Sequence, residues 1–282
     1  MKYQILHSSE YCYTHPAALS LNELCLIPRF TPFQKVIRHS FTSTPLDDYH
    51  RDRTDFFGNH WRLYAFEKPH SRLEILANHS VEVNRDNSLG INYQEVIDPF
   101  FFPSPMVRIH SYLADYGRRS FPLGRNTFDG IMDLNQRLFS DFIYDPKATT
   151  IETPLEEFFE KRKGVCQDYA HLMLAILRSL GFPARYVSGY LNTLPPPGKE
   201  KVLGADASHA WVAVHIPEMG WIDFDPTNGI LVSNDHITLA WGRDYGDVTP
   251  LKGVVLGGGS QKLNVKVTVL PEAGLSRETG LS

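Results

Sequence analysis

Short runs in which apolar and polar residues alternate dominate the first part of the chain, up to about residue 110. An alternation with a period of two indicates a β-strand, because successive side chains of a strand point to opposite faces. Turn-rich stretches such as residues 43–48 and 84–87 separate the runs. Their near-regular spacing favours an antiparallel β-sandwich or barrel, with strands at residues 3–7, 20–27, 34–40, 59–66, 72–83 and 96–100.

The pattern changes to a helical period after about residue 120, and apolar residues at that spacing predict a helix over residues 127–143. A short second helix is predicted to begin at Thr153. There Thr153 serves as the N-cap, Pro154 as the first helical residue and Glu156 as the partner in a capping box. A third helix is predicted over residues 166–180 and is apolar on most sides, so we expect it to be buried.

Runs of helices followed by runs of strands imply an α+β fold. We expect an N-terminal antiparallel β-sandwich-like domain at residues 1–120. A second domain at residues 121–282 should pack a central buried helix on an antiparallel sheet. The long polar segment at residues 192–207 is expected to be a mobile surface loop, and the last ten or so residues to be disordered. The later strands are predicted at residues 184–191, 208–216, 221–225 and 262–269.

Composition and charge narrow the class of protein. The 28 Lys and Arg residues oppose 32 Asp and Glu residues, for a formal net charge of −4, so neither a nucleic acid nor an anionic membrane is an expected partner. No stretch reaches the roughly 18 uninterrupted apolar residues of a membrane-spanning helix, and the N-terminus lacks the apolar run of a signal peptide. We therefore expect a cytoplasmic protein, and the sequence leaves its oligomeric state open.

Three cysteines are too few for a disulfide framework, and no C-x-x-C pair is present to hold zinc. The short histidine spacings of zinc hydrolases are absent as well, so we predict neither a metal nor a cofactor. Cys12 and Cys25 are expected to be buried thiols of the N-terminal strands. Cys166 stands alone in a different local context, which makes it the cysteine to examine.

Cys166 is predicted to lie in the first turn of the buried helix, directly after the cationic residues 161–163. A free thiol has a pKa of roughly 8.5, and a helix N-terminus or a neighbouring cation can lower it to about 3.5–7.5. These features favour a nucleophilic thiolate at neutral pH. The alternative is that Cys166 is a small buried apolar residue, as many lone cysteines are.

A nucleophilic cysteine needs a base, and His209 is the best placed of the twelve histidines because it opens a predicted strand directly after the long loop. We expect His171 to be a core residue and His236 to lie in a later turn. A carboxylate should orient the imidazole. Asp223 and Asp225 lie on one face of the next strand, and the hairpin register favours Asp225, although either could be a solvated strand residue.

Three segments now resemble the motifs of the transglutaminase-like superfamily, in its bacterial cysteine-peptidase-like branch. They read GVCQDYA at residues 164–170, SHAWV at 208–212 and GWIDFDPTN at 220–228. The resemblance implies a papain/transglutaminase-like core with Cys166 as nucleophile, His209 as general base and acid, and Asp225 as orienting group. It also implies acyl transfer through a thioester on a peptide or protein substrate.

Three functions remain open for such a core, two of them enzymatic. A hydrolase, either a peptidase or an amidase, is favoured, because no residue indicates a pocket for an incoming amine and no D-x-D-x-D-G calcium loop is present. A protein-glutamine transamidase that crosslinks proteins is the first alternative. The second is a non-catalytic interaction scaffold, and the complete set of motif residues argues against it.

Overall fold

The computed structural model describes residues 1–85, 98–193, 204, 206, 208–217 and 219–272. The start of the strand predicted at residues 96–100, most of the loop predicted at 192–207 and the predicted disordered tail lie outside the described residues. Within the described part of the chain, no helix is both long and apolar enough to cross a lipid bilayer. The cytoplasmic location stays a prediction.

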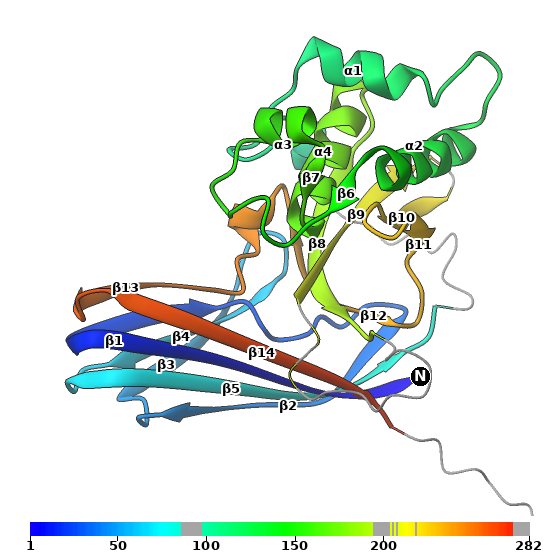
Figure 1. Cartoon of the computed structure of the whole chain (residues 1–282). Coiled ribbons are helices and arrows are strands. Elements are labelled where there is room, and N and C mark those ends of the chain that lie inside the picture. Colours follow the sequence, from blue (N-terminus) through cyan, green and yellow to red (C-terminus); the bar gives the residue numbers. More distant parts are fainter. Residues whose placement is uncertain (86–97, 194–203, 205, 207, 218, 273–282) are drawn as a thin grey trace, which may run out of the picture.

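An antiparallel sheet of seven strands makes up the N-terminal part of the molecule (Figure 1). Its path runs β2-β5-β1-β4-β3, and β13 and β14 also pair with β1. Alternate residues of β1, such as Tyr3 and Ile5, are fully buried, as the period of two requires. The strands are β1 (Lys2–Leu24), β2 (Gln34–Thr44), β3 (Tyr49–Thr54), β4 (His60–Phe66), β5 (His70–Val83), β13 (Leu251–Gly257) and β14 (Gln261–Pro271).

The strand predicted at residues 3–7 and residues 20–24 of the strand predicted at 20–27 are parts of the single long strand β1, which ends at Leu24. The register of β1 against β5 shifts between Cys12 and Ala17, and the strand changes partners there. Its first half pairs with β5 and β14, and its second half pairs with β4 and β13. An irregularity inside one strand therefore lies where the sequence predicted a gap between two strands.

The chain returns to the N-terminal sheet at its other end. The hairpin β13–β14 lies along both halves of β1 (Figure 1). The prediction that residues 121–282 form a separate domain needs correction at this point, because the last two strands belong to the first sheet. No local pattern specifies which sheet an alternating strand will join. The boundary near residue 120 otherwise stays a prediction.

A second antiparallel sheet, in the order β11-β10-β9-β8-β12, lies between the helices and the N-terminal sheet (Figure 1). Helix α4 packs on β8 and β9, and its residues Ala170 and Leu172–Leu177 are fully buried. The predicted α+β class is therefore confirmed. The strands are β8 (Ala184–Leu191), β9 (Ser208–Ile216), β10 (Gly220–Asp225), β11 (Ile230–Leu231) and β12 (His236–Gly242).

The predicted helices are present, with one wrong detail. Helix α3 begins at Leu155 with Pro154 as its N-cap, and Thr153 accepts a hydrogen bond from the backbone N–H of Thr150 instead of capping the helix. Residues 98–100, predicted as strand, form a 3₁₀ helix. The α-helices are α1 (Ser111–Arg118), α2 (Thr127–Asp141), α3 (Leu155–Lys161) and α4 (Cys166–Ser179), and the 3₁₀ helices are η1 (Asp98–Phe100) and η2 (Tyr245–Asp247). Two short strands, β6 (Ile143–Tyr144) and β7 (Lys163–Gly164), pair in parallel.

Side-chain amides join the two sheets along the outer edge of β12. Gln34 accepts from the backbone N–H of Thr238 and donates to its carbonyl, and Asn59 does the same for Trp241. Arg85, which follows β5, forms a buried ion pair with Asp223 at 2.9 Å. Side chains of the N-terminal sheet thus satisfy an edge of the second sheet as a neighbouring strand would.

Candidate active site

Cys166 is the first residue of α4, and the residues around it explain why the helix begins there. The Asp168 carboxylate accepts hydrogen bonds from the backbone N–H of Val165 at 2.8 Å and from the Thr149 hydroxyl at 2.6 Å. A Cβ at Gly164 would lie 2.4 Å from an oxygen of Asp168, so only glycine fits before the helix. The GVCQD segment thereby fixes the cysteine at the helix N-terminus.

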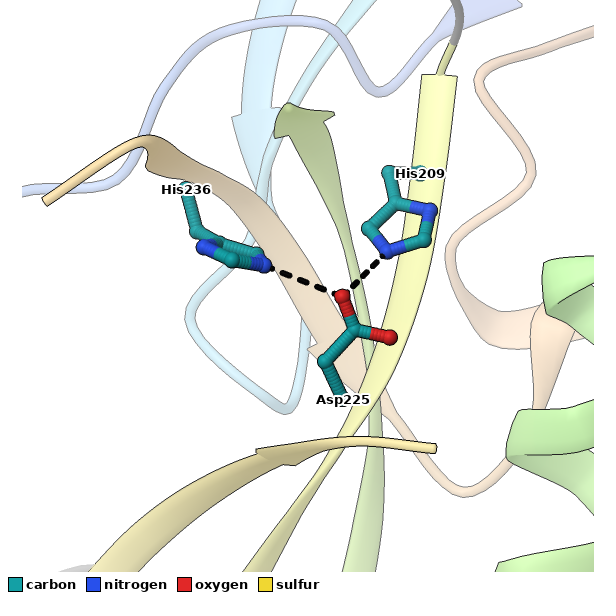
Figure 2. A group of neighbouring side chains, drawn as sticks. All are labelled: His209, Asp225 and His236. Atoms are coloured by element: carbon teal, nitrogen blue, oxygen red, sulfur yellow. Dashed lines mark hydrogen bonds and ion pairs between the residues drawn. The ribbon is translucent and has the colours of Figure 1, made fainter. Parts of the chain in front are cut away.

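His209 and Asp225 form a buried pair on neighbouring strands (Figure 2). His209 Nε2 lies 2.7 Å from Asp225 Oδ2, and the two side chains are 9% and 0% exposed. The β9–β10 register pairs Asp223 with Ala213, farther along β9 than His209. Asp225 follows the last pair of that ladder, and its side chain reaches the imidazole.

The Asp225 carboxylate is surrounded by donors. Oδ2 accepts from His209, from His236 at 3.1 Å and from the Asn228 side chain at 2.7 Å. Oδ1 accepts from the backbone N–H groups of Thr227 and Asn228. A carboxylate offers about four lone-pair sites, so its acceptor capacity is filled and its ionised form is favoured.

The electrostatics of the pair follow from these contacts. Burial alone would lower the pKa of His209, but its hydrogen bonds to Asp225 and Cys166, with their charges, raise this pKa to about 10. Burial alone would raise the pKa of Asp225, yet the hydrogen bonds from His209 and His236 hold it well below its usual range. At neutral pH the site therefore contains an imidazolium beside a carboxylate.

All three candidate residues predicted from sequence come together. Nε2 of His209 faces Asp225, and Cys166 lies near enough to the same imidazole to raise its pKa. The other carboxylate of β10, Asp223, pairs with Arg85 instead. His171 is buried in the core as expected, where its Nε2 accepts from the backbone N–H of Tyr245.

The sequence missed His236, which was expected in a turn. It is the first residue of β12 and only 1% exposed. Its Nε2 contacts the same oxygen of Asp225 that His209 contacts, from another side (Figure 2). Ile237, Leu239 and Trp241 after it alternate as strand residues do, which is the signal that could have placed it on a strand.

The ligand atoms of His209, Asp225 and His236 lie within 4.8 Å of one another, a spacing that could admit a metal ion. The two nitrogens lie 2.7 and 3.1 Å from one oxygen, which are hydrogen-bond distances. Protons shared with that oxygen account for the arrangement, and we assign no metal to it. The sequence could not indicate this group, because its members are dispersed along the chain.

This fold, with a helix-borne cysteine beside a histidine and an aspartate on adjacent strands, defines a transglutaminase-like protein. Residues 120–226 match the family model of the transglutaminase-like superfamily. Residues 3–82 match that of the bacterial transglutaminase-like N-terminal region. The chain belongs to the transglutaminase-like superfamily.

Relatives span nearly the whole chain. An uncharacterized protein of Mycobacterium tuberculosis is 33% identical over 97% of this chain and 94% of its own length. A protein-glutamine gamma-glutamyltransferase of Pseudomonas aeruginosa is 38% identical, but over only 32% of this chain and 15% of its own length. A crystal structure from Cytophaga hutchinsonii, described as "a Putative Cysteine Protease", shares the fold with a TM-score of 0.77 and 21% identity, and the match covers 96% of this chain and 90% of that one.

Proposed function

We propose that the protein is a transglutaminase-like cysteine hydrolase that cleaves peptide or amide bonds through a thioester. Cys166 is the nucleophile, His209 the general base and acid, and Asp225 the orienting group. The observation that carries the proposal is the buried imidazole of His209, which is hydrogen-bonded to a filled carboxylate and lies close enough to Cys166 for the thiol to raise its pKa. This is the pairing of nucleophile, base and orienting group that acyl transfer needs.

The reaction begins when the Cys166 thiolate attacks the carbonyl carbon of the substrate. The carbonyl oxygen becomes an oxyanion, which backbone N–H groups at the start of α4 can stabilise. His209 then gives its proton to the leaving nitrogen as the C–N bond breaks, and a thioester remains. His209 next takes a proton from water, the hydroxide oxygen attacks the thioester, and the carboxylic acid leaves as the thiolate returns.

Transamidation is the second candidate activity. It is favoured by the local similarity to the Pseudomonas aeruginosa protein-glutamine gamma-glutamyltransferase. In that case an amine takes the place of water in resolving the thioester, and the same three residues serve. Products separate the two activities, because hydrolysis yields a free carboxyl group and transamidation a new amide.

The test is mass spectrometry of a peptide library incubated with the protein, with and without a primary amine. We expect cleavage or deamidation by the wild type and none by Cys166→Ala or Cys166→Ser. Cys12→Ala is the matched control, because Cys12 is a half-buried thiol of β1. Full activity in Cys166→Ala would refute the mechanism, and amine incorporation in place of hydrolysis would select the transamidase. An interaction scaffold would convert no peptide.

A further inference from the structure

We propose that His236 is a positioning residue that holds the Asp225 carboxylate in place for His209. The inference rests on the proposed function and adds a fourth residue to it. His236 Nε2 lies 3.1 Å from Asp225 Oδ2, and both side chains are buried away from solvent. Figure 2 shows that the two imidazoles reach this oxygen from different sides.

The protonation of His236 follows from its other nitrogen. The backbone N–H of Ser233 donates to Nδ1 of His236 at 3.2 Å, so Nδ1 is an acceptor and carries no proton. The proton of the neutral ring must then be on Nε2, which faces Asp225. Neutral His236 is therefore a fixed donor to the carboxylate.

The surroundings of His236 keep it neutral. Burial lowers the pKa of His236, and although Asp225 acts in the opposite direction, the positive charges of His209 and Arg85 add to the lowering. These three groups come from β10, β9 and the segment after β5. Of the two imidazoles on the carboxylate, His209 can therefore hold the mobile proton while His236 serves as a spectator donor.

The strand that carries His236 is itself fixed by the N-terminal sheet. Thr238, two residues farther along β12, is bonded through its backbone to Gln34, and its hydroxyl accepts from Arg85. A connection therefore runs from the N-terminal sheet through β12 and His236 to Asp225. This gives the N-terminal part of the chain a role in placing the carboxylate.

The test compares His236→Gln with His236→Asn. The Gln amide can place its nitrogen near the position of Nε2 and donate to Asp225, whereas the Asn amide, one methylene shorter, reaches only the position of Nδ1. The readouts are the rate of Cys166 alkylation by iodoacetamide at pH 5–9, resolved by mass spectrometry, and kcat/KM on a peptide that the wild type cleaves. His79→Leu, which removes a fully buried imidazole of β5, is the matched control.

We expect His236→Asn to lose roughly tenfold or more in kcat/KM, mainly in kcat. Its alkylation by iodoacetamide below pH 7 should be slower than that of the wild type. His236→Gln should retain the wild-type profile, and so should His79→Leu. A purely structural role would lower the unfolding midpoint without moving the alkylation profile.

Two outcomes would overturn the inference: a folded His236→Asn variant with the wild-type profile, or a His236→Gln variant as impaired as His236→Asn. If His236→Asn does not fold, the decision falls to His236→Gln, whose wild-type profile would support the donor role. A wild-type protein that converts no peptide in the library experiment would refute the proposed function instead, so the two failures are distinguishable.

Discussion

Asp225 is the residue on which the candidate site depends most directly. Its carboxylate is fully buried and accepts from three side chains and two backbone N–H groups. These donors favour the ionised form, so the carboxylate does not take the proton of His209. In the proposed mechanism it keeps His209 oriented and positively charged until the leaving group needs a proton.

Asp225→Asn should lower kcat by roughly two to four powers of ten, because an amide cannot support the imidazolium. It should also shift the alkaline limb of the kcat/KM profile. The pKa of His209 is raised to about 10 in the native protein, so removing the charge of Asp225 moves this limb down toward the ordinary histidine value near 6.5. Asp223→Asn is the matched control on the same strand, since Asp223 pairs with Arg85, and its alkaline limb should stay in place.

The candidate site was predicted from sequence only as far as its motifs extend. Cys166, His209 and Asp225 each stand in a short segment whose local structure could be anticipated, and the structure brings them together. His236 follows the turn-forming residues 233–235, so a turn was the natural expectation. Its role depends on β12 lying beside β8, a pairing between segments far apart in the chain.

At the scale of elements, β12 occupies the edge of the second sheet and requires partners for its outer backbone groups. Gln34 and Asn59 supply them with a donor and an acceptor each. Gly189 on the neighbouring strand β8 is equally constrained, because a Cβ there would lie 2.1 Å from the carbonyl oxygen of Ile237. Particular residues therefore specify both sides of β12: two side-chain amides on the outer side and a glycine on the inner side.

Asn59→Leu should destabilise the protein by about 1–3 kcal/mol for each backbone group of Trp241 left buried without a partner. The measurement is urea unfolding at neutral pH. Gln261→Leu serves as the control because Gln261 is exposed on β14, and its effect should stay within about 0.5 kcal/mol. Equal stability of the two variants would show that Asn59 does not support β12.

At the scale of the whole molecule, buried histidines are distributed over both sheets and the central helix. His7, His79 and His171 are each at most 5% exposed. Burial lowers the pKa of His7 to about 4, of His79 to about 3 and of His171 to about 4. All three are neutral in the native protein at pH 7, and His7 also links the sheets through a hydrogen bond between its Nδ1 and the Tyr190 hydroxyl.

Stability should therefore fall steeply as the pH drops from about 6.5 toward 4. In this range the unfolded chain binds protons on these histidines and the native protein does not, so their contribution is complete above pH 6.5 and is lost on acidification. Each histidine changes the free energy of unfolding by about 1.4 kcal/mol per pH unit in this range. Urea unfolding at pH 7.5, 6 and 5 measures how the free energy of unfolding changes with pH. His79→Leu should reduce this slope by the contribution of one proton. A midpoint that does not change with pH would contradict the expectation.

The sequence by itself determined the α+β class, the long buried helix, most strands of the second sheet and the three motif residues, because each depends on a local period or a short motif. Tertiary structure decided what local patterns cannot encode. It placed β13 and β14 in the N-terminal sheet, paired β12 with β8 and brought His236 to Asp225. The physical reason is that hydrogen bonds between distant strands depend on which edges meet, and an alternating segment fits many edges equally well.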